Sequence, residues 1–300
     1  MDESQKRELI RILDKDALFD CPMGPYITFR AGGKAEALCA ANDLQQLKEL
    51  LSFAHRENLP CLVVGKGSNL LVRDGGLKGI ALLLKNELEG VEEKGGILRA
   101  GGGLGLSELG RFCHRKGLAG LEFFAGIPGT VGGAVAMNAG AWGKSTGDVV
   151  TGVEIITVDG ERMTKNRSEL QFGYRKAVLP NGSVVVRALF EVTQDRPEAV
   201  GERIRDYLER RKATQPLDYP SAGSVFKNPP HDSAGRLIEK VGLKGKRIGG
   251  AMISDKHANV IVNVGGARAE DILILIETAR QRVKEQTGVE LEPEIKVVGD

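Results

Sequence analysis

The chain has 300 residues, of which 41% are hydrophobic and 27% charged, and its formal net charge is +2. This composition is typical of a globular protein and excludes a disordered chain. So small a net charge gives no sign of a nucleic-acid or membrane partner, although it suits a small anionic ligand. The length predicts two or three subdomains, and the 40 glycines, roughly twice the usual share of about 7%, predict loops that something approaches closely.

The cysteines and histidines show no metal-ligand spacing. The four cysteines, Cys21, Cys39, Cys61 and Cys113, contain no CxxC pair, and the four histidines form neither HExxH nor a Cys/His cluster. We therefore expect buried free thiols and no metal. The chain has a charged amphipathic beginning and no run of about 18 apolar residues, so we expect a soluble cytoplasmic protein.

The first 84 residues read as an α/β unit. Leucine and isoleucine at helical spacing predict a helix over residues 3–13, and Asp43 is placed to cap a second helix over residues 42–57. Strand-like stretches precede and follow the second helix. The order of strand, helix and strand is typical of an α/β fold.

Residues 62–72 consist of two apolar runs separated by a short glycine-containing segment, a pattern that predicts a strand, a turn and a strand. Gly65 and Gly67 allow backbone amides to converge on an anion, and Ser68 and Asn69 add side-chain donors. A hairpin turn between two buried strands is the alternative. A second glycine-rich stretch at residues 125–134 favours the anion site, and two such loops suggest a large, phosphorylated ligand.

The middle of the chain predicts short strands and two helices. A helix over residues 106–116, with Ser107 as its cap, follows a glycine run at 101–105 that either binds an anion or forms an ordinary turn. No G-x-G-x-x-G lies between a strand and a helix, so we reject a Rossmann dinucleotide fold. Period-two patterns predict strands within 149–158 and 183–192, and a basic helix over 197–213 ends before Pro216.

Five motifs, in this order, make the chain resemble the UDP-N-acetylenolpyruvoylglucosamine reductase family over nearly its whole length. Each motif alone is weak, and their order is what makes the resemblance specific. They are Gly-Lys-Gly-Ser-Asn at 65–69, Ile-Pro-Gly-Thr-Val-Gly-Gly at 127–133, Phe-Gly-Tyr-Arg at 172–175, Ala-Gly-Ser-Val-Phe-Lys-Asn-Pro at 222–229 and Leu-Glu-Pro-Glu at 291–294.

The resemblance implies an α/β and α+β chain with the FAD-binding fold of vanillyl-alcohol oxidases and p-cresol methylhydroxylase. It implies two FAD-binding subdomains, 1–79 (joined by a C-terminal strand at 290–300) and 80–213, and a substrate-binding domain at 214–289. NADPH would reduce the FAD, and hydride would then pass to the enolpyruvyl ether of UDP-N-acetylglucosamine to give UDP-N-acetylmuramate for peptidoglycan synthesis. We expect a monomer whose partners are small molecules.

The resemblance assigns the catalytic roles to Ser224, Arg175 and Glu294. Ser224 would give a proton to the α carbon, and Arg175 would hold the substrate carboxylate in a bidentate grip. Glu294 would act with Arg175 on the protonated intermediate. From the residues alone, Ser224 also reads as a turn residue and Arg175 as a surface arginine, and Glu292 is the nearest competitor of Glu294.

The resemblance also assigns binding residues. For the substrate these are Tyr174, Lys227 and Asn228, although a solvated lysine is the alternative for Lys227. For FAD they are Arg30, Ala31, Gly32, Gly33, Gly65, Gly67, Ser68, Asn69, Ile127, Pro128, Gly129, Gly132, Gly133, Asn138 and Gly140. His257 and Asn259 are left outside the catalytic set, because a hydrogen-bonded structural histidine is the simpler interpretation.

Two features refine the resemblance. The stretch between Arg175 and Thr214 has no room for an inserted loop carrying a tyrosine over the substrate, so we assign the chain to the shorter type of the family. Ala177 stands where the arginine motif commonly continues to a serine, so a hydroxyl is missing there. The competing functions are an oxidase of the same flavin superfamily and a non-catalytic flavin-binding module.

Overall fold

The computed structural model describes all 300 residues, and the chain divides into two compact units. Unit 1 comprises residues 1–19, 36–66 and 79–210, and unit 2 comprises residues 20–35, 67–78 and 211–300. Because each unit is assembled from three separate segments, neither corresponds to one continuous stretch of sequence. None of the helices is both long enough and apolar enough to cross a bilayer.

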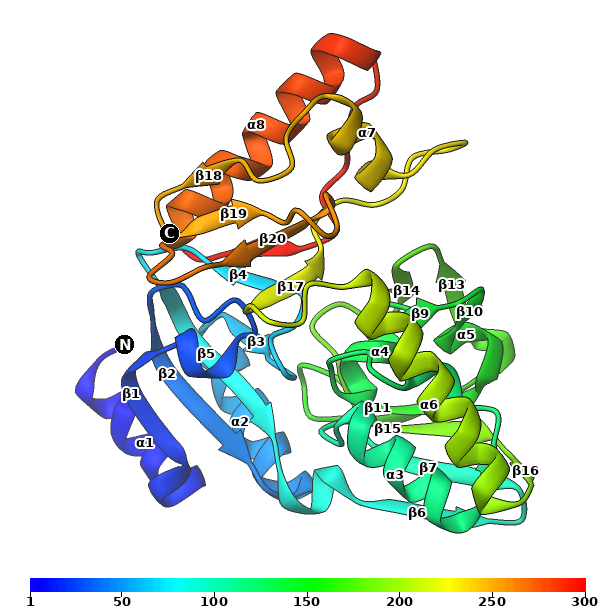
Figure 1. Ribbon diagram of the computed structural model, residues 1–300. Coiled ribbons are helices and arrows are strands. Elements are labelled where there is room, and N and C mark those ends of the chain that lie inside the picture. Colours follow the sequence, from blue (N-terminus) through cyan, green and yellow to red (C-terminus); the bar gives the residue numbers. More distant parts are fainter. The chain divides into compact units, whose positions relative to one another are not determined.

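The N-terminal helices pack against a four-stranded sheet. Asp2 and Asp43 accept hydrogen bonds from the first-turn amides of α1 and α2, as N-cap residues do. Leu9, Leu47 and Leu50 are fully buried in the core beneath these helices, which lie at the blue end of Figure 1. The helices are α1 (Glu3–Leu13) and α2 (Leu44–Arg56), and the sheet has the order β1 (Ala17–Pro22), β2 (Lys34–Ala41), β5 (Leu77–Leu84) and β3 (Cys61–Val63).

A five-stranded antiparallel sheet forms the second core of unit 1. Its order is β12 (Arg162–Asn166), β11 (Val150–Ile156), β15 (Val184–Glu191), β7 (Ile97–Gly101) and β6 (Val91–Lys94). The predicted strands within 149–158 and 183–192 are confirmed as β11 and β15, which pair directly. Buried residues of both strands, among them Val153 of β11 and Phe190 of β15, share a core with Phe123 and Phe124.

Helices over 106–116 and 197–214 were predicted, whereas two short helices over 131–136 and 146–149 were not. The predicted helix over 106–116 is confirmed, but its N-cap is Gly105, and Ser107 bonds the Glu108 side chain instead. The helices are α3 (Leu106–Lys116), α4 (Val131–Ala136), α5 (Thr146–Val149) and α6 (Pro197–Thr214). Short pairs complete the unit: β8 (Leu118–Ala119) with β16 (Thr193–Gln194), β9 (Gly140–Ala141) with β10 (Lys144–Ser145), and β13 (Gln171–Gly173) with β14 (Lys176–Val178).

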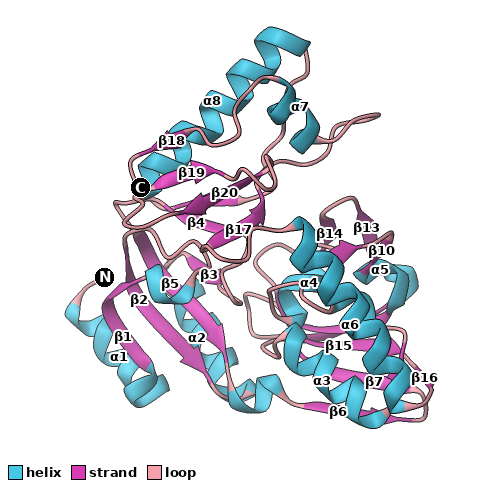
Figure 2. Ribbon diagram, in the orientation of Figure 1, coloured by secondary structure: helices cyan, strands magenta, loops and turns pink.

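Unit 2 is a small sheet with the long helix α8 packed along it, as Figure 2 shows. The strand order is β17 (Ser221–Ser224), β20 (Val260–Asn263), β19 (Ala251–Ile253) and β18 (Arg247–Ile248), and the helices are α7 (Ala234–Lys240) and α8 (Ala269–Thr287). Ile272, Leu275 and Ala279 of α8 are buried in its core. A separate parallel pair joins β4 (Leu70–Val72) to β21 (Lys296–Val298).

The glycine-rich turn at residues 64–69 does not close a hairpin. Strand β3, which precedes it, pairs in parallel with β5, whereas β4, which follows it, pairs in parallel with β21. The predicted strand, turn and strand are confirmed, and the hairpin alternative is wrong. The reason is that the two strands do not pair with each other, and β4 pairs with a strand near the C-terminal end of the chain.

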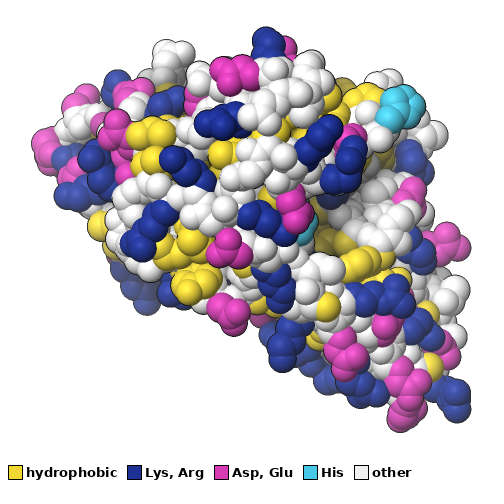
Figure 3. Space-filling model, turned by 45° about the horizontal axis from the view of Figure 1, so that its top comes forward, with side chains coloured by type: hydrophobic (Ala, Val, Ile, Leu, Met, Phe, Trp, Pro, Cys, Tyr) yellow, Lys and Arg dark blue, Asp and Glu magenta, His cyan; other side chains and the backbone are white.

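The surface carries both charges in a mixed pattern. Lysine and arginine side chains are spread over the face shown in Figure 3, with aspartate and glutamate among them. Several charged side chains form ion pairs with near neighbours in the sequence, such as Arg11 with Glu8 within α1 and Arg236 of the helix over 234–240 with Asp232, which precedes that helix. Such exposed pairs contribute little to stability.

Candidate active site

Ser224 ends strand β17 at an irregularity in the sheet. Ser221 pairs with Val262 and Ser224 with Val260, so β17 has one more residue than its partner between these two pairs. Gly223 has a φ of +68° within this bulge. A bulge of this kind redirects the next side chain and is frequent beside active sites. Ser224 itself is half-buried.

The segment that contains Glu294 lies directly against the chain after Ser224. The Glu294 N–H donates to the Val225 carbonyl at 2.7 Å, and the Lys227 N–H donates to the Glu292 carbonyl at 2.9 Å. A bridge between Phe226 and Pro293 completes the contact. The structure therefore brings two of the three predicted catalytic residues, Ser224 and Glu294, onto adjacent segments of unit 2.

The predicted FAD-binding turn touches this same segment. The Asn69 side-chain Nδ2 donates to the Glu294 carbonyl at 3.1 Å, and the Lys296 N–H donates to the Asn69 carbonyl at 2.9 Å. The Thr28 N–H donates to the Gly67 carbonyl at 3.3 Å. The turn at 67–69 is thus held from both sides within unit 2.

The predicted residues Arg30 to Gly33 also lie in unit 2, where the backbone is tightly packed. A Cβ on Gly33 would stand 2.4 Å from the Asp74 carbonyl oxygen, so only glycine fits there. The Asn263 side chain donates to the Phe29 carbonyl at 2.9 Å. The chain at 29–33 is therefore fixed by contacts to β20 and to the turn after β4.

Arg175 lies in unit 1, at the tip of the β13–β14 hairpin. Gly173 pairs with Lys176, which leaves Tyr174 and Arg175 as the two turn residues. Arg175 has a φ of +56°, and one guanidinium nitrogen donates to the Gly140 carbonyl at 3.0 Å. The guanidinium also stands 5.4 Å from the centre of the Tyr174 ring. The Tyr174 side chain is 57% exposed.

Two residues predicted to bind FAD, Asn138 and Gly140, also contact this hairpin. Asn138 donates from its side chain to the Gly173 carbonyl at 2.9 Å and accepts from the Gly147 N–H at 2.8 Å. The Gly140 carbonyl accepts from Arg175, as described above. The bonds from Asn138 to Gly173 and from Arg175 to Gly140 fix the place of Arg175 within unit 1, a role that the sequence did not indicate.

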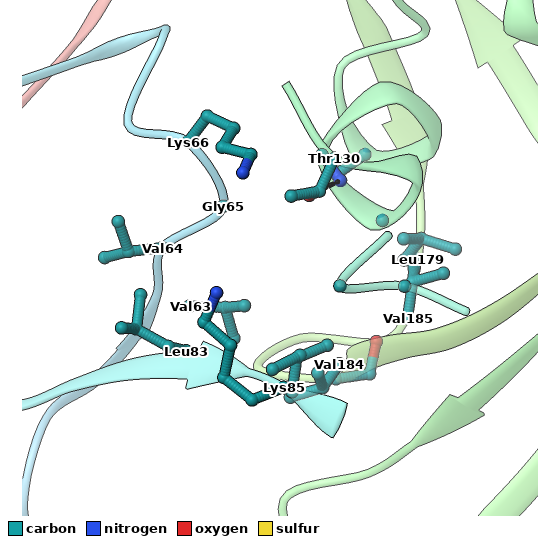
Figure 4. Close-up of a pocket in the computed structure, with 17 residues that line it drawn as sticks. Val63, Val64, Gly65, Lys66, Leu83, Lys85, Thr130, Leu179, Val184 and Val185 are labelled. Atoms are coloured by element: carbon teal, nitrogen blue, oxygen red, sulfur yellow. Dashed lines mark hydrogen bonds between the residues drawn. The ribbon is translucent and has the colours of Figure 1, made fainter. Parts of the chain in front are cut away.

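A cavity of about 130 Å³ lies in unit 1 between the segment ending at Lys66 and the start of α4. Figure 4 shows Lys66 extending from one wall toward Thr130 on the other. Three predicted FAD residues, Gly65, Gly132 and Gly133, line this cavity. Its other lining residues, which the sequence did not single out, include Val63, Leu83, Lys85, Leu179, Val184 and Val185.

The donor set of this cavity fits one portion of a dinucleotide such as FAD. A Cβ on Gly65 would stand 2.6 Å from Thr130 Oγ1, so a side chain at this position would displace Thr130. The ammonium groups of Lys66 and Lys85 are suited to phosphate oxygens. The volume is well below the roughly 300–1,000 Å³ of a pocket that encloses a whole drug-sized ligand. The cavity therefore suits a fragment of FAD, and the glycine run at 102–103 on its wall was the sequence signal for it.

Two family models match the chain in succession. Residues 35–165 match an FAD binding domain, and residues 215–298 match the C-terminal domain of UDP-N-acetylenolpyruvoylglucosamine reductase. A curated protein of that name from Moorella thermoacetica is 45% identical over 98% of this chain and 97% of its own. Another, from Syntrophus aciditrophicus, is 42% identical over 98% of this chain and 96% of its own.

This chain belongs to the UDP-N-acetylenolpyruvoylglucosamine reductase family. A crystal structure of the reductase from Thermus caldophilus has 39% sequence identity and a TM-score of 0.82, covering 94% of this chain and 98% of that one. A VAO-type flavoprotein from Myceliophthora thermophila has 15% identity and a TM-score of 0.52 over 65% of this chain and 47% of its own. That second likeness concerns the fold alone, and together these matches confirm the predicted fold class.

Proposed function

We infer that this protein reduces the enolpyruvyl ether of UDP-N-acetylglucosamine to UDP-N-acetylmuramate in peptidoglycan synthesis, with FAD and NADPH as its cofactors. The observation that carries this conclusion is the 45% identity to a reductase of this name over 98% of the chain. Bound FAD supplies the hydride chemistry that links oxidation of NADPH to reduction of the alkene. The protein supplies binding, orientation, a fixed positive charge and a proton.

We propose that Ser224 gives the proton to the α carbon of the substrate. Hydride arrival at the terminal carbon leaves negative charge that extends into the neighbouring carboxylate, and a strongly basic carbon can take a proton from a hydroxyl held close to it. The bulge at Gly223 and the half-buried place of Ser224 support this role. Proton transfer of this kind typically contributes about 10² to 10⁴ in rate.

Arg175 and Glu294 complete the proposed catalytic set. Arg175 would hold the substrate carboxylate, because its planar guanidinium forms two parallel hydrogen bonds and stays charged at any working pH. Its fixed place on the hairpin supports this role, since a positioned charge costs no reorganisation during the reaction. Glu294 would act with Arg175 on the intermediate, and its backbone contact with Val225 supports a role beside Ser224.

The binding residues stay proposals. Tyr174 is exposed and available to a substrate, whereas Lys227 bonds Glu292 and Asn228 accepts from the Ala234 N–H at 3.1 Å. A diphosphate that binds Lys227 would therefore displace Glu292. We also propose the FAD-binding residues that the resemblance gives, with FAD-binding subdomains at 1–79 and 80–213 and a substrate-binding domain at 214–289. We further propose that the protein is a cytoplasmic monomer that acts on small molecules only.

The test is a visible spectrum of the purified protein followed by two anaerobic additions. NADPH should bleach the flavin band, and the enolpyruvyl sugar nucleotide should then restore it. A yellow protein that reoxidises only with oxygen would indicate an oxidase. A protein that binds FAD but reacts with neither reagent would be a binding module, and a colourless protein that cannot be reconstituted with FAD would contradict the proposal.

A further inference from the structure

Asn259 is a buried amide in unit 2 whose hydrogen bonds all go to the chain beside Ser224 or to the turn before it. Asn259 is only 3% exposed. Its side-chain Oδ1 accepts from the Phe226 N–H at 2.9 Å, and its Nδ2 donates to the Phe226 carbonyl at 2.8 Å. Its backbone carbonyl accepts from the Val225 N–H at 2.8 Å.

These bonds extend the sheet past the point where β17 ends. Ser224 pairs with Val260, and beyond Ser224 the backbone of β20 no longer offers a regular partner to Phe226. The Asn259 side chain takes that place, because one amide group offers both a donor and an acceptor, as a strand neighbour does. Phe226 is only 1% exposed, so water cannot readily replace the Asn259 side chain as the hydrogen-bond partner of the Phe226 N–H and carbonyl.

The other side of the same segment bonds the chain around Glu294. Val225 offers its N–H to Asn259 and its carbonyl to the Glu294 N–H. Residues 225–226 therefore lie between Asn259 and Glu294, directly after Ser224. A shift of this segment would move the Ser224 hydroxyl and the Glu294 backbone together.

We propose that Asn259 is a positioning residue for the proton transfer, which fixes the Ser224 hydroxyl by clamping the Val225–Phe226 backbone. This inference rests on the proposed role of Ser224 and extends it to a residue that does not itself touch the substrate. A misplacement of about 1 Å in a reacting group costs on the order of 10² in rate. Loss of the clamp therefore slows the step that needs Ser224 and spares the step that does not.

The experiment compares Asn259→Ala and Asn259→Asp with Ser254→Ala as the matched control. Asn259→Ala removes both side-chain bonds, and Asn259→Asp keeps the acceptor but replaces the donor. Ser254 is also buried, at 3% exposed, and its hydroxyl oxygen accepts from the amides of Lys256 and His257 in the turn before Asn259. Ser254→Ala thus loosens the same region without touching residues 225–226.

Two half-reactions are measured by stopped flow on the full-length, FAD-loaded protein, well below its melting temperature. Reduction of the flavin by NADPH should stay within about twofold of the wild-type rate in all variants. Reoxidation by the enolpyruvyl substrate should fall by about 10² in both Asn259 variants, with a lower kcat and little change in KM, and should be nearly unchanged in Ser254→Ala. Equal slowing of both half-reactions, or an unchanged reoxidation in the Asn259 variants, would overturn the proposal.

Amide hydrogen exchange supplies a readout that needs neither cofactor nor turnover. In the wild-type protein, the Phe226 amide should exchange as slowly as the amides of β20, and in Asn259→Ala it should exchange much faster. Rapid exchange of the Phe226 amide in the wild-type protein would contradict the proposal that Asn259 fixes this backbone, even if the variants do not fold. If wild-type protein fails to reoxidise with the enolpyruvyl substrate, the proposed function fails instead.

Discussion

Replacing Gly223 by alanine separates backbone strain from steric clash at the bulge beside Ser224. Gly223 has a φ of +68°, and a Cβ built on it would meet no other heavy atom within 4 Å. The only cost is therefore the left-handed backbone, about 1–2 kcal/mol for a residue with a Cβ. Urea unfolding should show a loss of that size in Gly223→Ala.

Gly242 provides the matched control for this change. It lies in the same unit, has a φ of +73°, and likewise has open space at the Cβ position. Gly242→Ala should lose the same stability but keep both half-reactions. Gly110→Ala, in the interior of α3 with open space and no positive φ, should instead gain up to about 1 kcal/mol, because alanine favours a helix.

The catalytic readout then tests what the bulge does. Strain in Gly223→Ala is relieved most easily by a change at the bulge, which moves the Ser224 side chain. Reoxidation by substrate should slow in this variant while flavin reduction by NADPH is preserved. An unfolding free energy equal to that of the wild type would refute the strain argument, and unchanged reoxidation would refute the role of the bulge in directing Ser224.

Further predictions concern four side chains. Ser224→Ala should leave flavin reduction by NADPH nearly intact and slow reoxidation by substrate by about 10² to 10⁴, and equal slowing of both steps would remove the proton-donor role. Arg175→Lys should lower turnover strongly, because a lysine cannot form the bidentate grip; an unchanged rate would exclude Arg175 from the site. Burial raises the pKa of the Cys39 and Cys113 thiols to about 12, so neither should react with a thiol reagent at pH 8 until the protein unfolds. These thiols ionise more easily in the unfolded chain than in the folded one. Their contribution to the free energy of unfolding is therefore complete below about pH 8.5 and is lost as the pH rises toward 12. Urea unfolding at pH 8 and at pH 10 would measure this loss.

Local sequence patterns were enough to predict helices α1, α2, α3 and α6 and strands β3, β4, β11 and β15. Helix α2 begins after Asp43, as the capping pattern predicts, and α1 covers the predicted range from Glu3 to Leu13. The strands β11 and β15 follow their period-two patterns. Burial of one face of a helix or strand depends on residues that are neighbours in sequence, so such patterns are readable without the fold.

The family, and with it the reaction, was also determined by the sequence, because each of the five motifs is a short continuous stretch. The cap of α3 was not predicted correctly, since Ser107 lies inside the helix rather than before it. The turn at 64–69 was left open between two interpretations, because its flanking strands pair with β5 and β21, and the second of these lies more than two hundred residues away.

Only the tertiary structure decided how the site is supported. The contacts of Asn69 with the Glu294 segment, of Asn138 with the Arg175 hairpin and of Asn259 with Phe226 each join residues that are far apart in the chain. An asparagine side chain bonds any backbone group that the fold places beside it, so its partner leaves no local pattern in the sequence. The sequence by itself determined several of the elements, the family and, through the family, the candidate catalytic residues, and the fold decided which amides hold those residues in place.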